Sequence, residues 1–163
     1  ADLATGTSAN VIPRMRTVGA AVKGNLSPRF VCSCIPQAAN AALTFQIFGF
    51  FSSSTPAAGT GSSKACVRSV TTGNMFFVTG DGASEQTTDL GAPPASQTVY
   101  EIRTDDAGVT WLCYVNGVLK ATHATTIPVA TTAMYAMFGL SNNTTTSMIV
   151  TNIDYFMADQ QRS

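Results

Sequence analysis

Residues 99–123 read VYEIRTDDAGVTWLCYVNGVLKATH and carry the strongest fold signal in the chain. They contain three runs of β-branched and aromatic residues, at 99–104, 109–115 and 118–123. Residues that favour tight turns separate these runs. The pattern predicts an antiparallel meander of three strands.

Two turn signals fix the register of this meander. In the first, the side chains of Asp105 and Asp106 can accept hydrogen bonds from the backbone two residues on, and Gly108 can adopt a positive φ. The second is Asn116-Gly117, the pair that best suits a two-residue type I′ turn. We therefore expect these five residues to have structural roles as turn formers.

The middle run is apolar on both of its faces. Side chains in a strand alternate with period 2. One face then carries Val109, Trp111, Cys113 and Val115, and the other carries Thr110, Leu112 and Tyr114. We expect such a strand to lie well inside a two-layer sandwich, with its outer face covered by a loop or a neighbouring subunit.

The rest of the chain continues the β pattern. About ten to twelve short runs with turn signals between them predict an all-β sandwich, and no segment has helix periodicity over three turns. Residues 11–157 are expected to form one domain, with a flexible or partner-bound arm at 1–10 and a polar tail at 158–163. Two long polar segments, 52–63 and 80–96, are interpreted as contact loops.

Charge is scarce in this sequence. Only 11% of the 163 residues are charged, against roughly 25% in typical soluble domains. A surface built from Ser, Thr, Ala, Asn and Gln is typical of a chain that is held in an assembly. A secreted or adhesive β-domain has a similar composition, and that alternative stays open.

The charge distribution also restricts the partners that we expect. Nine Lys and Arg balance nine Asp and Glu, and they are scattered singly rather than gathered into a basic stripe. Direct binding to nucleic acid is therefore not expected. No apolar run reaches the roughly 20 residues that a membrane-spanning helix needs, so no membrane partner is expected either.

The four cysteines, at 32, 34, 66 and 113, suggest no metal centre. There is no Cys-x-x-Cys pair and no companion cluster of histidines. We expect reduced, buried thiols, although a bridge between Cys66 and Cys113 is not excluded by the sequence.

Residues with catalytic potential do not form a known pattern. Glu101 has no acidic partner two residues on, as a glycosidase strand would provide. Asp105 and Asp106 lie in the predicted turn, and His123 lacks a Gly-x-Ser-x-Gly nucleophile motif elsewhere in the chain. Acidic residues in segment 80–96 match no calcium-loop spacing. We therefore predict neither an enzyme nor a bound metal or cofactor.

Five segments of the C-terminal half resemble a known family. These are residues 100–103, 105–108, 115–117, 122–128 and 153–155, which read YEIR, DDAG, VNG, THATTIP and IDY. In this order they resemble the concanavalin A-like jelly-roll domains of tailed-bacteriophage structural proteins. The resemblance implies an antiparallel two-sheet jelly-roll sandwich. It covers residues 99–157 well and the preceding strands loosely.

The resemblance also implies a function in a virus particle. We expect a capsid decoration or cement protein that bridges capsid subunits in the virion after synthesis in the host cytoplasm. Its partners would be the major capsid protein and further copies of itself, as a homo-oligomer that we expect to be a trimer. The predicted contact residues are Ala1, Asp2, Leu3, Thr55, Pro56, Asp81, Glu85 and Asp89.

The alternative is a glycan-binding, lectin-like module of a tail fibre or adhesin. Such a module binds sugars with exposed aromatic side chains on one sheet face. The residues predicted to stack on a glycan are Tyr100, Trp111, Tyr114 and Tyr135.

Overall fold

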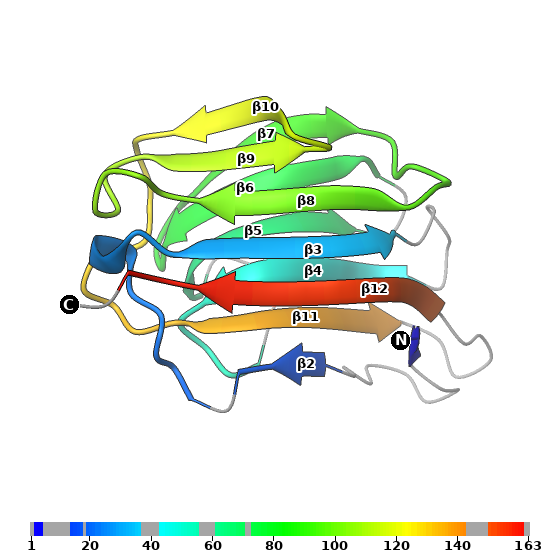
Figure 1. Ribbon diagram of the computed structural model, residues 1–163, viewed down its shortest axis with the longest axis horizontal. Coiled ribbons are helices and arrows are strands. Elements are labelled where there is room, and N and C mark those ends of the chain that lie inside the picture. Colours follow the sequence, from blue (N-terminus) through cyan, green and yellow to red (C-terminus); the bar gives the residue numbers. More distant parts are fainter. Residues whose placement is uncertain are drawn as a thin grey trace.

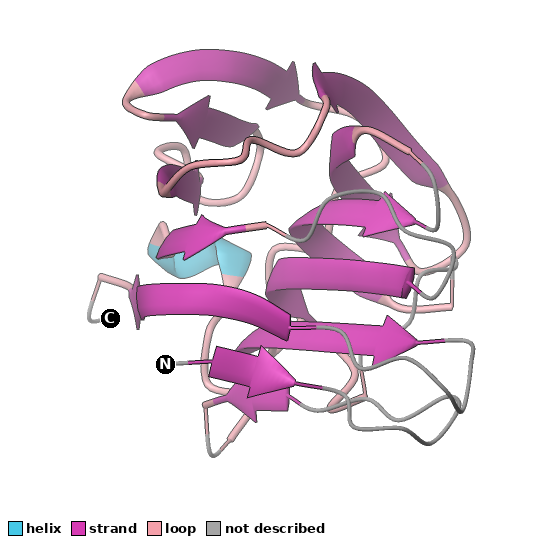
Figure 2. Ribbon diagram, turned by 90° about the vertical axis from the view of Figure 1, so that its right-hand side faces the viewer, coloured by secondary structure: helices cyan, strands magenta, loops and turns pink. Residues whose placement is uncertain are grey.

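The protein is a sandwich of two antiparallel six-stranded sheets (Figures 1 and 2). The computed structural model describes residues 2–4, 14–17, 19–36, 43–55, 61–70, 73–142 and 150–161. Within these residues the helical structure is one short turn, Gly24–Leu26. None of the described helical structure has the length and apolar composition that a membrane-spanning helix requires.

Each sheet draws strands from both halves of the chain. Sheet A, nearest the viewer in Figure 1, has the order β1 (Asp2–Ala4), β12 (Val150–Asp159), β3 (Arg29–Ile35), β8 (Thr98–Arg103), β9 (Trp111–Val115) and β10 (Val118–His123). Sheet B has the order β2 (Arg14–Arg16), β11 (Tyr135–Asn142), β4 (Leu43–Phe51), β5 (Ser63–Val70), β6 (Met75–Asp81) and β7 (Glu85–Gly91).

The predicted meander is confirmed as β8, β9 and β10, which are neighbours in sheet A. Asn116 and Gly117 have φ values of 50° and 78°, as both central residues of a type I′ turn require. In the other turn, Asp106 Oδ1 accepts a hydrogen bond from the Thr110 backbone N–H at 2.7 Å. This hydrogen bond closes the turn, β9 begins after it at Trp111, and Val109 is 62% exposed rather than part of the strand.

The core lies between the sheets and is rich in aromatic rings. Phe48 of β4 packs against Tyr100 of β8 at 5.1 Å between ring centroids and against Phe138 of β11 at 5.2 Å. Phe50 meets Trp111 edge-on at 5.7 Å. Each pair except Phe48–Phe138 joins the two sheets, so these rings fix how the layers sit on each other.

Three expectations, one about a loop and two about the chain ends, differ from the structure. Segment 80–96 is not one long loop, because residues 85–91 form β7, the edge strand of sheet B. In the predicted arm, residues 2–4 pair with β12 as β1, whereas residues 1 and 5–10 lie outside the described residues. The predicted polar tail also differs, because β12 extends to Asp159.

All four cysteines are free and buried. The bridge between Cys66 and Cys113 that the sequence left open therefore does not form. Cys113 belongs to the core between the sheets, whereas Cys66 belongs to a second apolar cluster on sheet B. The expectation of reduced, buried thiols is confirmed.

Candidate functional site

A network of charged side chains lies on the outer face of sheet A. Glu101 of β8 accepts two hydrogen bonds from Arg29 of β3, from Nε at 2.9 Å and from Nη2 at 3.1 Å. Arg103 Nη1 donates to the same carboxylate at 3.3 Å. The pairing of β3 with β8 sets Arg29 directly opposite Arg103, so Glu101 holds together two cations that would otherwise repel each other.

Arg103 is fixed by three further contacts, two with Tyr114 and one with Asp105. Its guanidinium lies over the ring of Tyr114 at 4.7 Å from the centroid, and Nη2 donates to Tyr114 Oη at 3.0 Å. It also forms an ion pair with Asp105 Oδ2 at 3.2 Å. A planar guanidinium held on a ring and by two carboxylates is presented in one orientation.

The network sets the charge state of its own carboxylate. The hydrogen bonds from Arg29 lower the pKa of Glu101, and Arg103 lowers it further. Glu101 in turn raises the pKa of Arg29, mainly through the same hydrogen bonds. Glu101 is therefore ionised at neutral pH and acts as a fixed acceptor for the two arginines.

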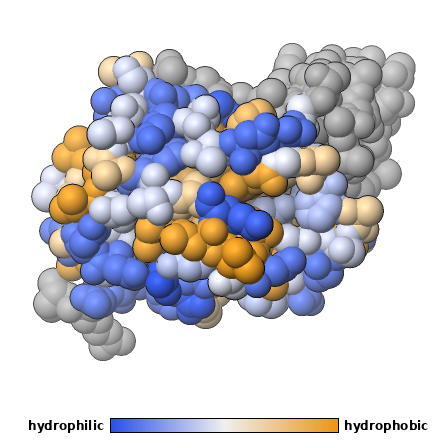
Figure 3. Space-filling view, turned by 90° about the horizontal axis from the view of Figure 1, so that it is seen from above, coloured by the Kyte–Doolittle hydropathy of each residue, from blue (hydrophilic) through white to orange (hydrophobic). Residues whose placement is uncertain are grey.

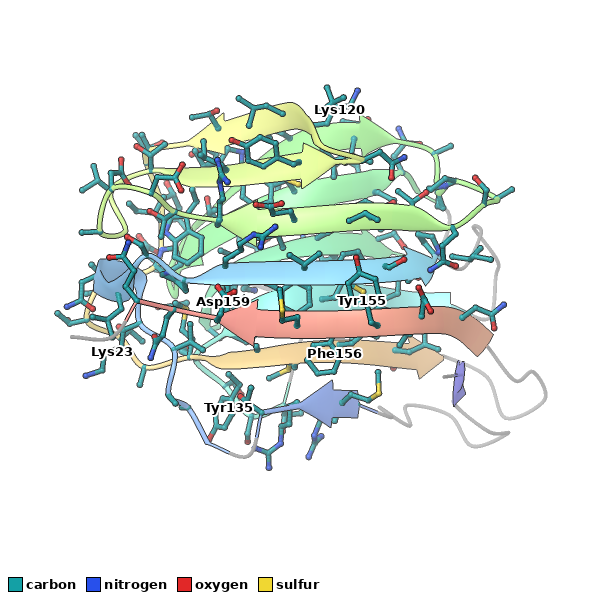
Figure 4. All side chains as sticks on the ribbon, viewed as in Figure 1. Lys23, Lys120, Tyr135, Tyr155, Phe156 and Asp159 are labelled. Atoms are coloured by element: carbon teal, nitrogen blue, oxygen red, sulfur yellow. The ribbon has the colours of Figure 1, made fainter. Side chains whose placement is uncertain are left out.

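Beside this network the surface forms a hollow of about 500 Å³, which we call the polar hollow. It is lined by Ser27, Arg29, Arg103, Thr104, Asp105, Asp159, Gln160 and Gln161. Figure 4 labels Asp159 at the end of β12, on the face of sheet A. The lining thus comes from the ends of β3, β8 and β12, the turns before β3 and after β8, and the segment after β12.

Hydrogen bonds to backbone groups hold the segment after β12, which lines part of the polar hollow. The Gln160 side chain accepts a hydrogen bond from the Lys23 N–H at 3.0 Å and donates to the Ala21 carbonyl at 2.9 Å. The Gln161 N–H donates to the Leu26 carbonyl at 2.8 Å. These bonds hold the segment after β12, and the pairing of β12 with β3 sets Asp159 directly beside Arg29, so the site is formed before any ligand arrives.

Chemically, the polar hollow offers donors and acceptors at close range. The two guanidiniums donate, and the carboxylates of Asp105 and Asp159 accept. Two positive and two negative lining charges sum to zero. Such a surface suits a ligand whose groups both donate and accept and which carries no large charge of its own.

The outer face of sheet B is different. A second ion cluster joins Glu85 of β7 to Lys64 Nζ at 2.8 Å and to Arg68 Nη1 at 3.0 Å. Beside it lies a buried apolar cluster, formed by Phe45, Ile47, Phe51, Cys66, Val78 and Met137. Glu85 was predicted as a contact residue, but its carboxylate is engaged by two cations of its own sheet.

The predicted stacking residues fall into two groups. Trp111 and Tyr100 point into the core and are 0% and 2% exposed, so neither can stack on a surface glycan, and both are removed from that set. Tyr114 and Tyr135 point outward and are partly exposed. Tyr114 lies under Arg103, and Tyr135 lies under Arg16 at 5.1 Å.

The other predicted contact residues are scattered. Asp81 accepts hydrogen bonds from the backbone of Ala83 and Ser84, both at 2.8 Å, and Asp89 accepts two from the Asn74 amide. These bonds lower the pKa of both carboxylates. Thr55 is exposed, whereas Ala1 and Pro56 lie outside the described residues, as do the side chains of Asp2 and Leu3.

Metal-ligand groups do not gather in the part of the chain that the structure describes. No three His, Cys, Asp or Glu side chains there lie close enough together to hold a metal ion. His123 is buried between two hydroxyls, with Nδ1 2.9 Å from Thr79 Oγ1 and Nε2 2.9 Å from Thr88 Oγ1. Burial lowers the pKa of His123, which favours the neutral ring.

Sequence reasoning missed Arg29, Arg103 and Asp159 as members of one site. Each is a single charge in a β-run, and no local motif links them. They meet because β3 pairs with β8 on one side and with β12 on the other.

No protein-family model and no curated protein matches this chain. Solved structures do match. The β-glucanase of Bacillus licheniformis superposes with a TM-score of 0.64 at 19% identity, over 91% of this chain and 71% of that one. The carbohydrate recognition domain of Emp47p gives 0.68 at 8% identity, over 98% and 82%. Alginate lyase AlyC3, solved with dimannuronate, gives 0.67 at 10% identity, over 99% and 75%.

These likenesses show the fold. The chain has the two-sheet jelly-roll architecture of concanavalin A-like lectins and glucanases, which confirms the predicted fold class. The prediction that the chain is not an enzyme is corrected, because solved enzymes, β-glucanases and an alginate lyase, share this fold. The fold is therefore compatible with catalysis as well as with carbohydrate binding.

Proposed function

We propose that the chain is a glycan-binding module and that the polar hollow on sheet A is its sugar-binding surface. One observation carries this proposal: two oriented guanidiniums and two carboxylates from separate segments line one preformed hollow of about 500 Å³. A volume of this size is within the roughly 300–1,000 Å³ range of small-molecule sites. Sugar-binding domains and sugar-cleaving enzymes among the matching folds add support.

The chemistry of the polar hollow favours a neutral sugar. Sugar hydroxyls donate and accept at once, so adjacent hydroxyls can bridge a guanidinium and a carboxylate. The lining charges of Arg29, Arg103, Asp105 and Asp159 cancel, and Glu101 beneath them adds a negative charge. A polyanionic glycan would meet repulsion from the carboxylates, whereas an uncharged one would not.

A glycan array followed by titration tests this proposal. We expect hits among neutral oligosaccharides, for example a β-1,3-1,4-linked glucan tetrasaccharide, and weaker binding of dimannuronate. The variant Arg103→Ala removes a donor and the ordered surface on Tyr114, so we expect about a tenfold loss of affinity. Asp159→Asn removes one charged acceptor beside Arg29, and we expect about a threefold loss.

Arg14→Ala is the matched control. Arg14 is exposed on β2 of sheet B, away from the polar hollow, and its replacement should leave affinity unchanged. An array without a neutral-glycan hit, or equal binding by the Arg103→Ala and Arg14→Ala variants, would contradict the proposal. Assays for new reducing ends and for unsaturated sugars on the same ligands measure whether binding is accompanied by cleavage.

A second candidate is the role in a virus particle that the sequence resemblance implies. The low charge favours it, together with apolar side chains exposed on sheet A, of which Tyr155 and Met157 lie on β12. In this role the chain would bridge capsid subunits as a homo-oligomer, with the major capsid protein as partner. Light scattering that finds a monomer, with no binding to particles that lack the protein, would exclude this role.

A further inference from the structure

A second cavity opens between the two sheets, at the end of the sandwich near the β9–β10 turn. Its volume is about 210 Å³, and it is separate from the polar hollow. Apolar and polar groups share its wall about equally, and the apolar lining residues are Met75, Leu90, Ala92, Pro94 and Val115. An apolar cavity of about 150 Å³ in another protein holds benzene, so this one has room for a ring with a short substituent.

Polar groups occupy the remaining wall. They belong to Thr98 and Tyr100 of β8, to Asn116 of the turn and to Lys120 of β10. Tyr100 is 2% exposed and lies on the cavity wall, and its hydroxyl is not among the buried polar atoms that lack a partner, so it reaches the space of the cavity. A phenol hydroxyl on a cavity wall can donate a hydrogen bond to a ligand that supplies an acceptor.

Lys120 gives the cavity its charge. Its side chain is exposed and forms no ion pair with the residues that the structure describes. It projects from β10 at the edge of sheet A (Figure 4). The view onto this edge shows hydrophobic surface interrupted by hydrophilic groups (Figure 3). The exposed apolar residues of β10 are Val118 and Leu119.

Burial of Tyr100 defines which polar partner it can take. Loss of solvent raises the pKa of the Tyr100 phenol, so the group stays protonated at neutral pH and can donate a hydrogen bond. The Thr98 hydroxyl donates to the Ser96 carbonyl at 3.0 Å and keeps acceptor capacity. An anion near Lys120 would thus accept from Tyr100 while its apolar body contacted the cavity wall.

We propose that this cavity is a binding site for a small amphipathic carboxylate, with its apolar body between the sheets and its carboxylate near Lys120 and Tyr100. The site does not depend on glycan binding at the polar hollow. A ligand of this kind is smaller than an oligosaccharide and makes its main contacts with apolar side chains.

Titration with benzoate, followed by ligand-observed NMR, tests the proposal. Benzyl alcohol is the probe of similar shape without charge. We expect saturable binding of benzoate that is at least threefold tighter than binding of benzyl alcohol. Lys120→Gln should weaken benzoate binding about threefold, and Tyr100→Phe about fivefold, in line with the loss of one hydrogen bond.

Two variants complete the test. Ala92→Trp places a large side chain at an exposed position on the cavity wall and should abolish binding without disturbing the core. Lys23→Gln removes an exposed lysine at the opposite side of the molecule and should change nothing (Figure 4). Near-ultraviolet circular dichroism from buried Trp111 verifies that each variant is folded. Absence of saturable binding, or binding by the Ala92→Trp variant equal to that of the wild type, would overturn the proposal.

Discussion

The outer faces of the two sheets carry the same ionic arrangement in different surroundings. On sheet A, Glu101 lies between Arg29 and Arg103, and on sheet B, Glu85 lies between Lys64 and Arg68. The cations of sheet A are 42% and 34% exposed, whereas those of sheet B are 0% and 13% exposed. The two glutamates are both mostly buried, at 17% and 12% exposed, so the faces differ in the exposure of the cations that bind them.

Because their cations differ in exposure, we expect the two ion clusters to differ in how much each contributes to ligand binding and to the stability of the fold. Exposed ion pairs contribute roughly 0–1 kcal/mol, because water screens them and side-chain entropy opposes them. Buried pairs carry a large desolvation cost, and removal of one partner leaves an uncompensated charge. We therefore expect the network on sheet A to be available to a ligand at little cost in stability, and the cluster on sheet B to be required for folding.

Replacement of Glu85 gives the largest expected effect. Glu85→Gln removes the negative charge that Lys64 and Arg68 share in the buried cluster. We expect the free energy of unfolding to fall by about 4 kcal/mol. Denaturation in urea, followed by Trp111 fluorescence, measures this change. Glu101→Gln on sheet A is the matched control, with an expected loss below about 1 kcal/mol. Equal losses in the two variants would contradict the contrast between the faces.

Two glycines with positive φ differ in the same way, since one lies in a tightly packed strand and the other in an open turn. Gly49 of β4 has φ 137°, and an added Cβ would clash with the Ala65 carbonyl oxygen and lie 2.8 Å from Cys66 Cα. Gly117, in the β9–β10 turn, has φ 78° and no atom within 4 Å of such a Cβ.

Both positions disfavour a side chain through φ, but only the first is also overpacked. We expect Gly49→Ala to cost about 3 kcal/mol and Gly117→Ala about 1 kcal/mol in the same denaturation experiment. If Gly117→Ala lowered the free energy of unfolding as much as Gly49→Ala or more, the close packing of β4 on β5 would not contribute to the cost at Gly49.

The parts of the fold that the sequence predicted are those with local signals. The meander was predicted because its strands are adjacent in sequence and Asn116-Gly117 specifies a turn type. Strand β7 was missed because its sequence, EQTTDLG, is polar. Its stability comes from pairing with β6 and from tertiary contacts such as that of Thr88 with His123, which no local pattern encodes.

The candidate site was mostly beyond the reach of sequence reasoning. Glu101 was considered as a lone carboxylate because its partner Arg29 is 72 residues away in the chain. The apolar outer face of sheet B was equally hidden, since alternation along β4 shows two apolar faces without showing which one meets the other sheet. For the same reason Tyr100 and Trp111 were named as stacking residues in the glycan-binding alternative, although alternation along its strand favoured a core position for Trp111.

The pH dependence of stability measures how much the ionised Glu101 carboxylate contributes on sheet A. The pKa of Glu101 lies below its ordinary value of 4.5, chiefly through the hydrogen bonds from Arg29. A carboxylate with a lowered pKa in the folded state stabilises the protein above its ordinary pKa, and this contribution is lost as the pH falls through the folded-state pKa. Wild type should therefore exceed the Glu101→Gln variant by a constant amount, at most about 1 kcal/mol, above about pH 5.5.

Below pH 4.5 that difference should shrink toward zero. Urea denaturation of both proteins at a series of pH values measures it. A difference that grows on acidification would mean that the protonated form of Glu101 is the stabilising one, and the assigned hydrogen bonds from Arg29 would then be wrong.

Added salt should have the smallest effect on stability, and it tests directly whether the ion cluster on sheet A is more accessible to solvent than the one on sheet B. Between 0.1 M and 1 M NaCl the Debye length falls from about 10 Å to about 3 Å, so exposed charges are screened and buried ones much less. The difference in unfolding free energy between wild type and Glu101→Gln should fall by a few tenths of a kcal/mol. The corresponding difference for Glu85→Gln should stay constant, because Lys64 is fully buried and its partner nearly so. If both differences fell together, water and ions would have access to the cluster on sheet B, and the two faces would differ in composition but not in surroundings.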